Sequence, residues 1–263
     1  RDPRRDLPIV IAMIVLPHGI VSSSAAAQTF LEDSAAIEED DDGRRSTGIV
    51  EVKAGPYYPS IDSEPGLVGK PYETTFGSGA STMVQLEIDR FLLWPYGQFG
   101  VALGLGYMSN KAQAFEQTAN GEPDYDARAS ADETAFHLLP LAASLVYRFT
   151  WIADETVLPL VPYVKAGLDY GIWWATKGDG SLSRTARNGK ARGGTLGWHG
   201  SLGLLFRADA LDPGAARSMR TDWGVDHVGF LFEVTCADMS GLGTSNRLHV
   251  GDLFWTAGLS FEY

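Results

Sequence analysis

The chain ends in Thr256-Ala257-Gly258-Leu259-Ser260-Phe261-Glu262-Tyr263, the stretch that decides how the rest is interpreted. Alternate residues here are apolar, and the residues between them are polar or glycine. This two-residue period is typical of a β-strand whose faces meet two different environments. A soluble protein would pack the apolar face on a second sheet, whereas a transmembrane barrel would turn it to lipid.

The same alternation recurs along the chain and predicts eight strands in all. The other seven are residues 48–56, 82–90, 98–108, 135–149, 160–173, 195–207 and 227–237. Most of them carry charged residues on the face opposite the apolar one. Pro140 lies inside the fourth predicted strand, where it would remove one ladder hydrogen bond and indicates a bulge or a strand start.

The connections between these strands alternate in length. Those at 57–81, 109–134, 174–194 and 238–251 are long and polar, and those at 91–97 and 150–159 are short. Long outer loops alternating with short periplasmic turns are typical of outer-membrane barrels. Residues 208–226 are the exception: Asp212 as N-cap and Pro213 at the first helical position predict one short periplasmic helix.

Aromatic residues gather near both ends of the predicted strands. One group is Phe99, Tyr147, Phe149, Trp151, Phe206, Phe261 and Tyr263, and the other is Tyr107, Trp173, Trp174, Trp198 and Trp255. Aromatic side chains prefer the membrane–water boundary. The sequence therefore predicts an all-β fold: an eight-stranded antiparallel up-and-down transmembrane β-barrel over residues 48–263, in the bacterial outer membrane.

The amino-terminal part has a different composition. Arginines, an apolar run from Leu7 to Val21 and then Ala25-Ala26-Ala27 predict a signal peptide over residues 1–27. Residues 28–47 are strongly acidic with few apolar side chains, which predicts a disordered periplasmic tail.

Composition excludes several classes of function. The net charge of −12 argues against nucleic acid, and the single cysteine excludes an intramolecular disulfide. The histidines show no metal-ligand spacing, and no glycine-rich stretch ends in Lys-Ser or Lys-Thr. We expect neither a metal nor a cofactor.

The predicted lumen carries charges of both signs. An eight-stranded barrel is just wide enough inside for side chains to fill it. Alternation along the strands points these charged residues inward: Glu51, Lys53, Glu87, Asp89, Arg148, Lys165, Asp169, Arg207, Glu233 and Glu262. Isolated charges there would be costly, so we expect them to pair into a filled lumen. The alternative is an ion pathway.

An enzyme interpretation rests on His199-Gly200-Ser201 together with Glu233. These residues resemble the His-x-Ser pair of outer-membrane lipid A deacylases. The resemblance implies Ser201 as nucleophile, His199 as base and Glu233 as the residue that orients the imidazole. Alternation points both His199 and Ser201 into the lumen, whereas a deacylase needs them to face lipid. The sequence therefore favours a protein that is not an enzyme.

The outer loops and the last strand predict partners. The loop at 109–134 is mainly acidic and that at 174–193 is basic, so they pair with each other or the basic one contacts lipopolysaccharide phosphates. Loops on a rigid scaffold are common binding sites. Thr256, Gly258, Phe261 and Tyr263 resemble the carboxyl-terminal signal read by the barrel-assembly machinery. Outer-membrane lipids, lipopolysaccharide and that machinery are the expected partners.

The layout of residues 46–263 is similar to an uncharacterised outer-membrane barrel family of myxobacteria. The matching features are Tyr57-Tyr58-Pro59, Pro140-Leu141, Tyr147-Arg148-Phe149, Leu211-Asp212-Pro213 and the closing Gly258–Tyr263. The resemblance implies a fold and a location but no site. We expect an integral outer-membrane protein with a structural role or a binding and adhesion role of its loops. The alternatives are a narrow, porin-like channel and a lipid A-modifying acyl hydrolase.

Overall fold

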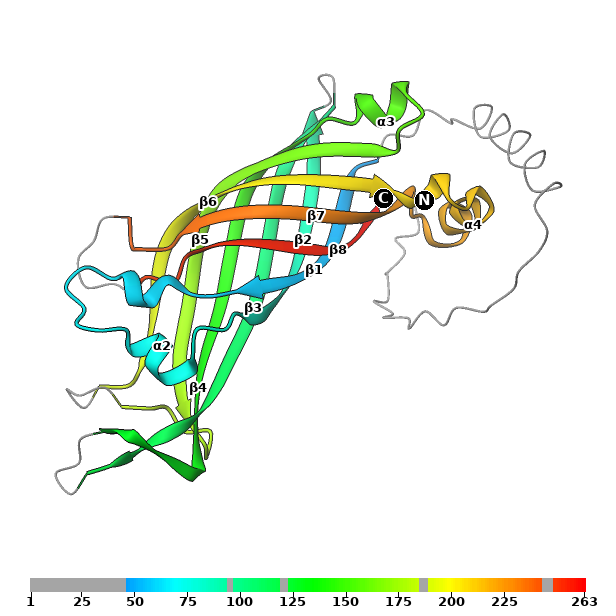
Figure 1. The fold of residues 1–263 in the computed structure, drawn as a ribbon. Helices are drawn as coiled ribbons and strands as arrows, with labels where there is room; N and C mark the ends of the chain where they lie inside the picture. Colours follow the sequence, from blue (N-terminus) through cyan, green and yellow to red (C-terminus); the bar gives the residue numbers. More distant parts are fainter. Residues whose placement is uncertain (1–45, 94–96, 119–122, 185–188, 243–247) are drawn as a thin grey trace, which may run out of the picture. The chain divides into compact units, whose positions relative to one another are not determined.

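A computed structural model of the chain describes residues 46–93, 97–118, 123–184, 189–242 and 248–263. Its strands are β1 (Gly48–Tyr57), β2 (Ser81–Leu93), β3 (Gln98–Gln117), β4 (Pro123–Arg148), β5 (Leu160–Lys177), β6 (Arg192–Arg207), β7 (His227–Asp238) and β8 (Asp252–Glu262). Neighbours in sequence pair antiparallel, and β1 also pairs with β8, so the sheet closes (Figure 1). The predicted eight-stranded antiparallel barrel is confirmed.

The two faces of each strand differ as the sequence predicted. On β8, Trp255 and Ala257 are exposed on the outside, whereas Thr256 and Ser260 are buried in the interior. Because the side-chain period of a strand is two residues, one face is apolar and points outward, and the other fills the lumen.

The two ends of the barrel carry different elements (Figure 1). The end that holds the start of β1 and the last residue of β8, here called the terminal end, also holds α3 (Trp151–Glu155), η2 (Ala208–Ala210) and α4 (Pro213–Trp223). The opposite end, here called the loop end, holds η1 (Ser60–Ser63) and α2 (Pro71–Phe76).

Helix α4 begins as predicted, but the expectation of a single short helix was wrong. Asp212 caps α4 by accepting a hydrogen bond from the backbone N–H of Ala215 at 2.9 Å. Helices α2 and α3 have six and five residues, too few for a helical period to be recognised. The start of α2 is capped from η1, because Asp62 accepts from the N–H groups of Tyr72 and Glu73 at 2.8 Å.

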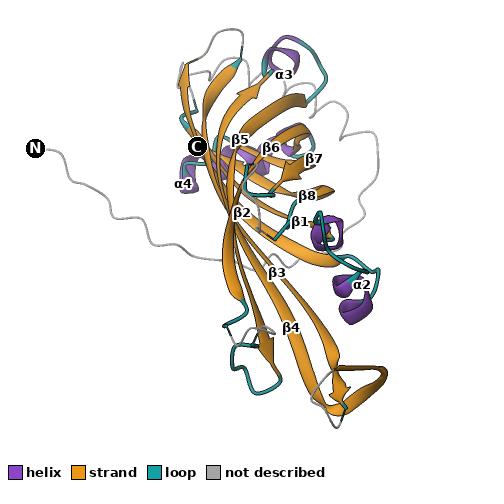
Figure 2. Cartoon of the chain, turned by 90° about the vertical axis from the view of Figure 1, so that its left-hand side faces the viewer, coloured by secondary structure: helices purple, strands orange, loops and turns teal. Residues whose placement is uncertain are grey.

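Strands β3 and β4 are longer than the predicted 98–108 and 135–149, and they project past the barrel as a two-stranded ribbon (Figures 1 and 2). Residues expected to form an outer loop pair instead, as Gln113 does with Glu133. Backbone ladders need no apolar face, so the alternation of hydrophobicity gave no sign of this ribbon.

Pro140 causes neither the bulge nor the strand start that its position indicated. Strand β4 runs through it, and Leu105↔Leu141 and Met108↔Leu138 keep one register on both sides, so no residue is inserted. Gly106 faces the proline ring: a Cβ on that glycine would lie 2.7 Å from Pro140 Cγ. The bare glycine makes room for the ring inside the sheet.

The predicted signal peptide at 1–27 and all but the last two residues of the predicted tail at 28–47 lie outside the described residues. Within the described ranges, no helix is long and apolar enough to cross a membrane.

Candidate functional site

The lumen near the terminal end holds a group of buried charges contributed only by strands. This group, here called the ionic network, consists of Glu51, Lys53, Glu87, Asp89, Arg148, Lys165 and Glu233. Strands β1, β2, β4, β5 and β7 supply them, so the network spans the barrel. With all groups ionised, four carboxylates face three cations.

Glu51 is the centre of the ionic network because it contacts all three cations. One carboxylate oxygen accepts from the Arg148 guanidinium. The other lies 2.9 Å from Lys165 Nζ and 3.3 Å from Lys53 Nζ. Arg148 also donates to Asp89 at 2.8 Å. These contacts offset the desolvation of five fully or almost fully buried charges.

The two lysines are held by the same set of acids. Lys53 Nζ lies 2.9 Å from Glu233 and 3.3 Å from Glu87. Lys165 Nζ contacts Glu87 and lies 3.2 Å from Glu233. Each ammonium group thus meets three carboxylates, Glu51 included, and carboxylates bridge the two strands that carry the lysines. Ion pairs therefore join the strands across this part of the lumen.

A buried tyrosine completes this packing. The Tyr163 ring lies 4.7 Å from Arg148 Cζ and 4.8 Å from Lys165 Nζ, within the range of cation–π attraction. It fits because Gly203, opposite it on β6, has no side chain: a Cβ there would lie 2.1 Å from the ring. Small residues on one strand make room for large ones on the next.

Three of the charges that the sequence placed in one lumen network, Asp169, Arg207 and Glu262, lie apart from it, so that part of the prediction was wrong. Arg207 is near the terminal end, where it donates to Asp154 of α3 at 2.8 Å and lies 3.8 Å from Glu262. Asp169 lies on the loop-end side and contacts His199. Alternation fixes which face a residue occupies, but distance along a tilted strand decides which charges meet.

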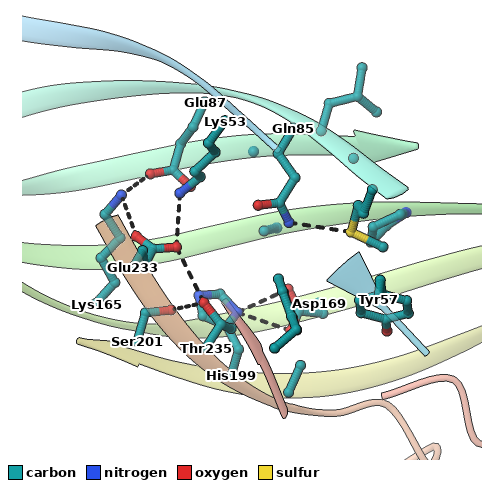
Figure 3. Close-up of a pocket in the computed structure, with 18 of the residues that line it drawn as sticks. Lys53, Tyr57, Gln85, Glu87, Lys165, Asp169, His199, Ser201, Glu233 and Thr235 are labelled. Atoms are coloured by element: carbon teal, nitrogen blue, oxygen red, sulfur yellow. Dashed lines mark hydrogen bonds and ion pairs between the residues drawn. The ribbon is translucent and has the colours of Figure 1, made fainter. Parts of the chain in front are cut away.

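A cavity of about 50 Å³ lies beside the ionic network (Figure 3). Lys53, Glu87, Lys165 and Glu233 line it together with Asp169, His199, Ser201 and Thr235. Apolar lining comes from Met83, Met239 and Phe254. A polar cavity of this size has room for a few water molecules.

Three polar side chains beside this cavity have the connectivity of a Ser-His-Asp triad. His199 Nδ1 lies 2.9 Å from both carboxylate oxygens of Asp169, and His199 Nε2 lies 2.9 Å from Ser144 Oγ. A carboxylate only accepts, so Nδ1 donates to it, and Nε2 of the neutral ring accepts from the hydroxyl. The imidazole passes over Gly167, where a Cβ would lie 2.8 Å from His199 Cε1.

The catalytic set of the enzyme interpretation does not form. Ser201 Oγ forms a hydrogen bond with Thr235 Oγ1 at 2.8 Å. Glu233 forms ion pairs with Lys53 and Lys165. His199 instead contacts Ser144, which was not among the predicted site residues. Ser144 and His199 are joined by the register of three strands, Ser144↔Gly167 and Gly167↔His199. The sequence signal for this contact was a serine, a glycine and a histidine on the inward faces of three consecutive strands.

The loop end of the lumen is closed by apolar residues. This cluster, here called the apolar plug, consists of Tyr57, Ile61, Tyr72, Met83, Met108, Phe136, Leu138, Met239, Val250 and Phe254. Loop segments contribute to it: Tyr57 donates to the Val250 carbonyl, and Tyr58 N–H donates to Asp252 at 2.7 Å. Burial raises the pKa of Tyr72 in α2 to about 12, so this hydroxyl stays protonated at neutral pH.

The outside of the barrel is an apolar band. Large exposed side chains on the outward positions include Val52, Leu86, Leu103, Leu145, Leu168, Leu202, Phe230 and Trp255. Exposed apolar area on this scale needs an apolar solvent. A closed barrel leaves no unpaired strand edge, so its backbone can lie within a bilayer. Cys236, a free thiol, is also exposed on this face.

The residues of the predicted assembly signal lie on the strand that closes the barrel. Gly258 pairs with Lys53 of β1, and a Cβ on it would lie 2.1 Å from the Val52 carbonyl oxygen. Thr256 is fully buried, and Tyr263 is exposed at the terminal end. Their recognition by an assembly machinery stays a prediction.

Comparisons with known proteins give likenesses of fold only. No protein-family model and no curated protein matches the chain. The chain is similar to the outer membrane protein OprG from Pseudomonas aeruginosa, with 13% identity over 84% of this chain and 97% of that chain and a TM-score of 0.46. Ail, the attachment invasion locus protein of Yersinia pestis, shares 11% identity over 83% of this chain and 97% of its own, with a TM-score of 0.39. The outer membrane enzyme PagL shares 14% identity over 81% of this chain and 97% of its own, with a TM-score of 0.33.

The closed sheet and its apolar exterior identify the chain as an integral β-barrel of the bacterial outer-membrane type. The resemblance to the myxobacterial family stays a prediction.

Proposed function

We propose that this protein is an outer-membrane barrel that neither conducts ions nor performs catalysis, and that serves the envelope through its structure and through binding by its loop end. We place the terminal end on the periplasmic side of the membrane and the loop end on the outer side. The single observation that supports the proposal is the doubly filled lumen, in which the ionic network and the apolar plug lie one above the other.

Conductance of the purified, folded full chain in planar bilayers tests this proposal. We expect no steady current, because ions would have to displace paired buried charges and then cross an apolar layer. The control is the variant Met108→Gly with Phe254→Gly, which shortens two residues of the apolar plug but keeps the ionic network. It should also stay closed. Steady open-channel currents from the unmodified protein would reject the proposal in favour of a narrow channel.

A second candidate function, acyl hydrolysis, is favoured by the Ser144–His199–Asp169 contacts. In this reaction Ser144 Oγ would attack an ester carbonyl and pass its proton to His199 Nε2, which would return it to the departing alcohol as the ester bond breaks and the acyl-enzyme forms. Ser144 pairs through its backbone with Ala102 and Gly167, so the surrounding strand N–H groups serve ladders and not an oxyanion. A fluorophosphonate probe should leave the folded protein unlabelled; labelling that Ser144→Ala abolishes would establish the hydrolase instead.

A further inference from the structure

The outer surface near the loop end carries a row of polar and aromatic residues across four strands. Ser109 pairs with His137, His137 with Trp174, and Trp174 with Arg192. These cross-strand neighbours lie on the same outward face as the apolar band. The row therefore marks the boundary at which the strands leave the apolar band.

The aromatic rings of this row form a fixed platform. His137 stacks on Trp174 with 5.0 Å between ring centroids and 14° between planes, and Tyr107 stacks on the other side of His137 at 6.2 Å. Both imidazole nitrogens are engaged, Nδ1 by the Tyr107 hydroxyl at 3.0 Å and Nε2 by the Thr176 hydroxyl at 3.2 Å. These bonds hold three ring systems side by side on the surface.

A groove adjoins the platform at Trp174. It has a volume of about 500 Å³ and is lined by Ile172, Trp173, Trp174, Leu182, Arg192 and Gly193. Most of this lining is apolar, and Arg192 supplies its positive charge. The groove thus combines a surface for acyl chains with a cation beside an indole ring.

Cations lie at both sides of the platform. Arg192 is exposed on β6, and Lys111 on β3 is the next outward residue beyond Ser109. Glu133 on β4 is the nearest carboxylate along the same strand face, four residues beyond His137, and it pairs with Gln113 of the ribbon. Positive charges on either side of a stacked aromatic surface are complementary to phosphate groups on a sugar ring.

We propose that this surface, formed by Tyr107, Lys111, His137, Trp174 and Arg192, binds the phosphorylated saccharide headgroup of an outer-leaflet glycolipid. The sugar lies on the aromatic platform, its phosphates contact the two cations, and acyl chains follow the groove and the apolar band. The inference rests on the proposed function, since it requires the loop end to face outward.

Native mass spectrometry of the full chain in phosphatidylcholine nanodiscs tests the site, with bisphosphorylated lipid A as the probe. We expect saturable binding of lipid A. The double variant Lys111→Gln with Arg192→Gln should weaken the affinity for lipid A on the order of tenfold. Both cations attract the phosphates, and the variant removes both charges. Trp174→Leu should also weaken this affinity, through loss of the stacking surface.

Arg90→Gln is the matched control, since Arg90 is an exposed cation on β2 near the terminal end. It should leave lipid A binding unchanged. Lipid A with both phosphates removed should bind the unmodified protein weakly and should not distinguish it from the double variant. Heat-modifiable gel mobility verifies that each variant is folded.

Unchanged binding by the folded double variant, or an equal loss with Arg90→Gln, would overturn the inference. Neither result bears on the proposal that the lumen is closed to ions. Steady conductance with intact lipid A binding would instead reject the proposed function and keep the site, so the two failures are distinguishable.

Discussion

The ionic network and the apolar plug fill the same lumen by opposite chemistry. The network consists of charges that only strands contribute, and every one of them depends on partners from other strands. The plug consists of apolar side chains, and Ile61, Tyr72, Met239 and Val250 in it come from outside the eight strands. The first region is closed by the barrel itself, and the second is closed when the loops fold onto it.

The two regions differ in what a single lost side chain leaves behind. A charge removed from the network leaves its partners buried with fewer counterions, and a buried charge is costly unless its pairing is complete. A side chain removed from the plug leaves a cavity that neighbours can partly fill. The network should therefore be less tolerant of substitution than the plug.

The largest effect is expected for Glu51→Gln, because Glu51 contacts all three cations of the network. We expect the free energy of unfolding to fall by about 3–5 kcal/mol. Urea unfolding in phospholipid vesicles, followed by gel mobility, measures it. Glu73→Gln breaks the exposed pair with Lys70 and should cost at most about 1 kcal/mol. Equal losses in the two variants would mean that burial adds nothing to the network.

In the apolar plug, Leu138→Ala should lower the free energy of unfolding by about 2–5 kcal/mol, since Leu138 is fully buried. Leu145 lies on the outward face of the same strand and is 55% exposed. Leu145→Ala should cost less, because lipid fills the space. The same urea measurement applies, and a larger loss for Leu145 would contradict the assignment of the two faces.

Between the two regions, Ser144→Ala should cost about 1–3 kcal/mol, because it leaves His199 Nε2 buried without its donor. Ser201→Ala should cost less, since its partner Thr235 keeps a hydrogen bond to Glu233. The reverse order would restore the sequence-based pairing of Ser201 with His199. Thermal unfolding of both variants in the same detergent makes the comparison.

The smallest effect on the barrel is expected for Arg128→Ala at the loop end. Arg128 donates to the carbonyls of Thr74 and Thr75 at 2.6 and 3.0 Å and to that of Gln113 at 2.7 Å, so it ties α2 to the ribbon. Its loss should change global stability by less than about 1 kcal/mol, as for most surface substitutions. Limited proteolysis should nevertheless cleave residues 58–80 faster. Lys70→Ala, on the same connection, is the control; unchanged cleavage in Arg128→Ala would show that α2 needs no tie.

The sequence predicted the network better than the plug. Two-residue alternation fixes the face of a strand residue, so Glu51, Lys165 and Glu233 could be assigned to the lumen without knowing the register. The partner of His199 depends on which residues of β4, β5 and β6 stand in one row, and alternation carries no information on that. The contribution of Tyr72 depends on how a connecting segment folds back, which no strand pattern encodes.

The position of the ionic network has a consequence for the order in which the barrel is built. Lys53 and Glu233 are 180 residues apart in the chain, and Glu51 and Arg148 are 97 apart. Contacts between such distant residues form late, after much chain entropy has been lost. Until β7 arrives, Lys53 of β1 and Lys165 of β5 lack one of their three carboxylates, Glu233. The pairing of β1 with β8 closes the barrel around the completed ionic network. Opening that seam would expose several buried ions to the bilayer at once.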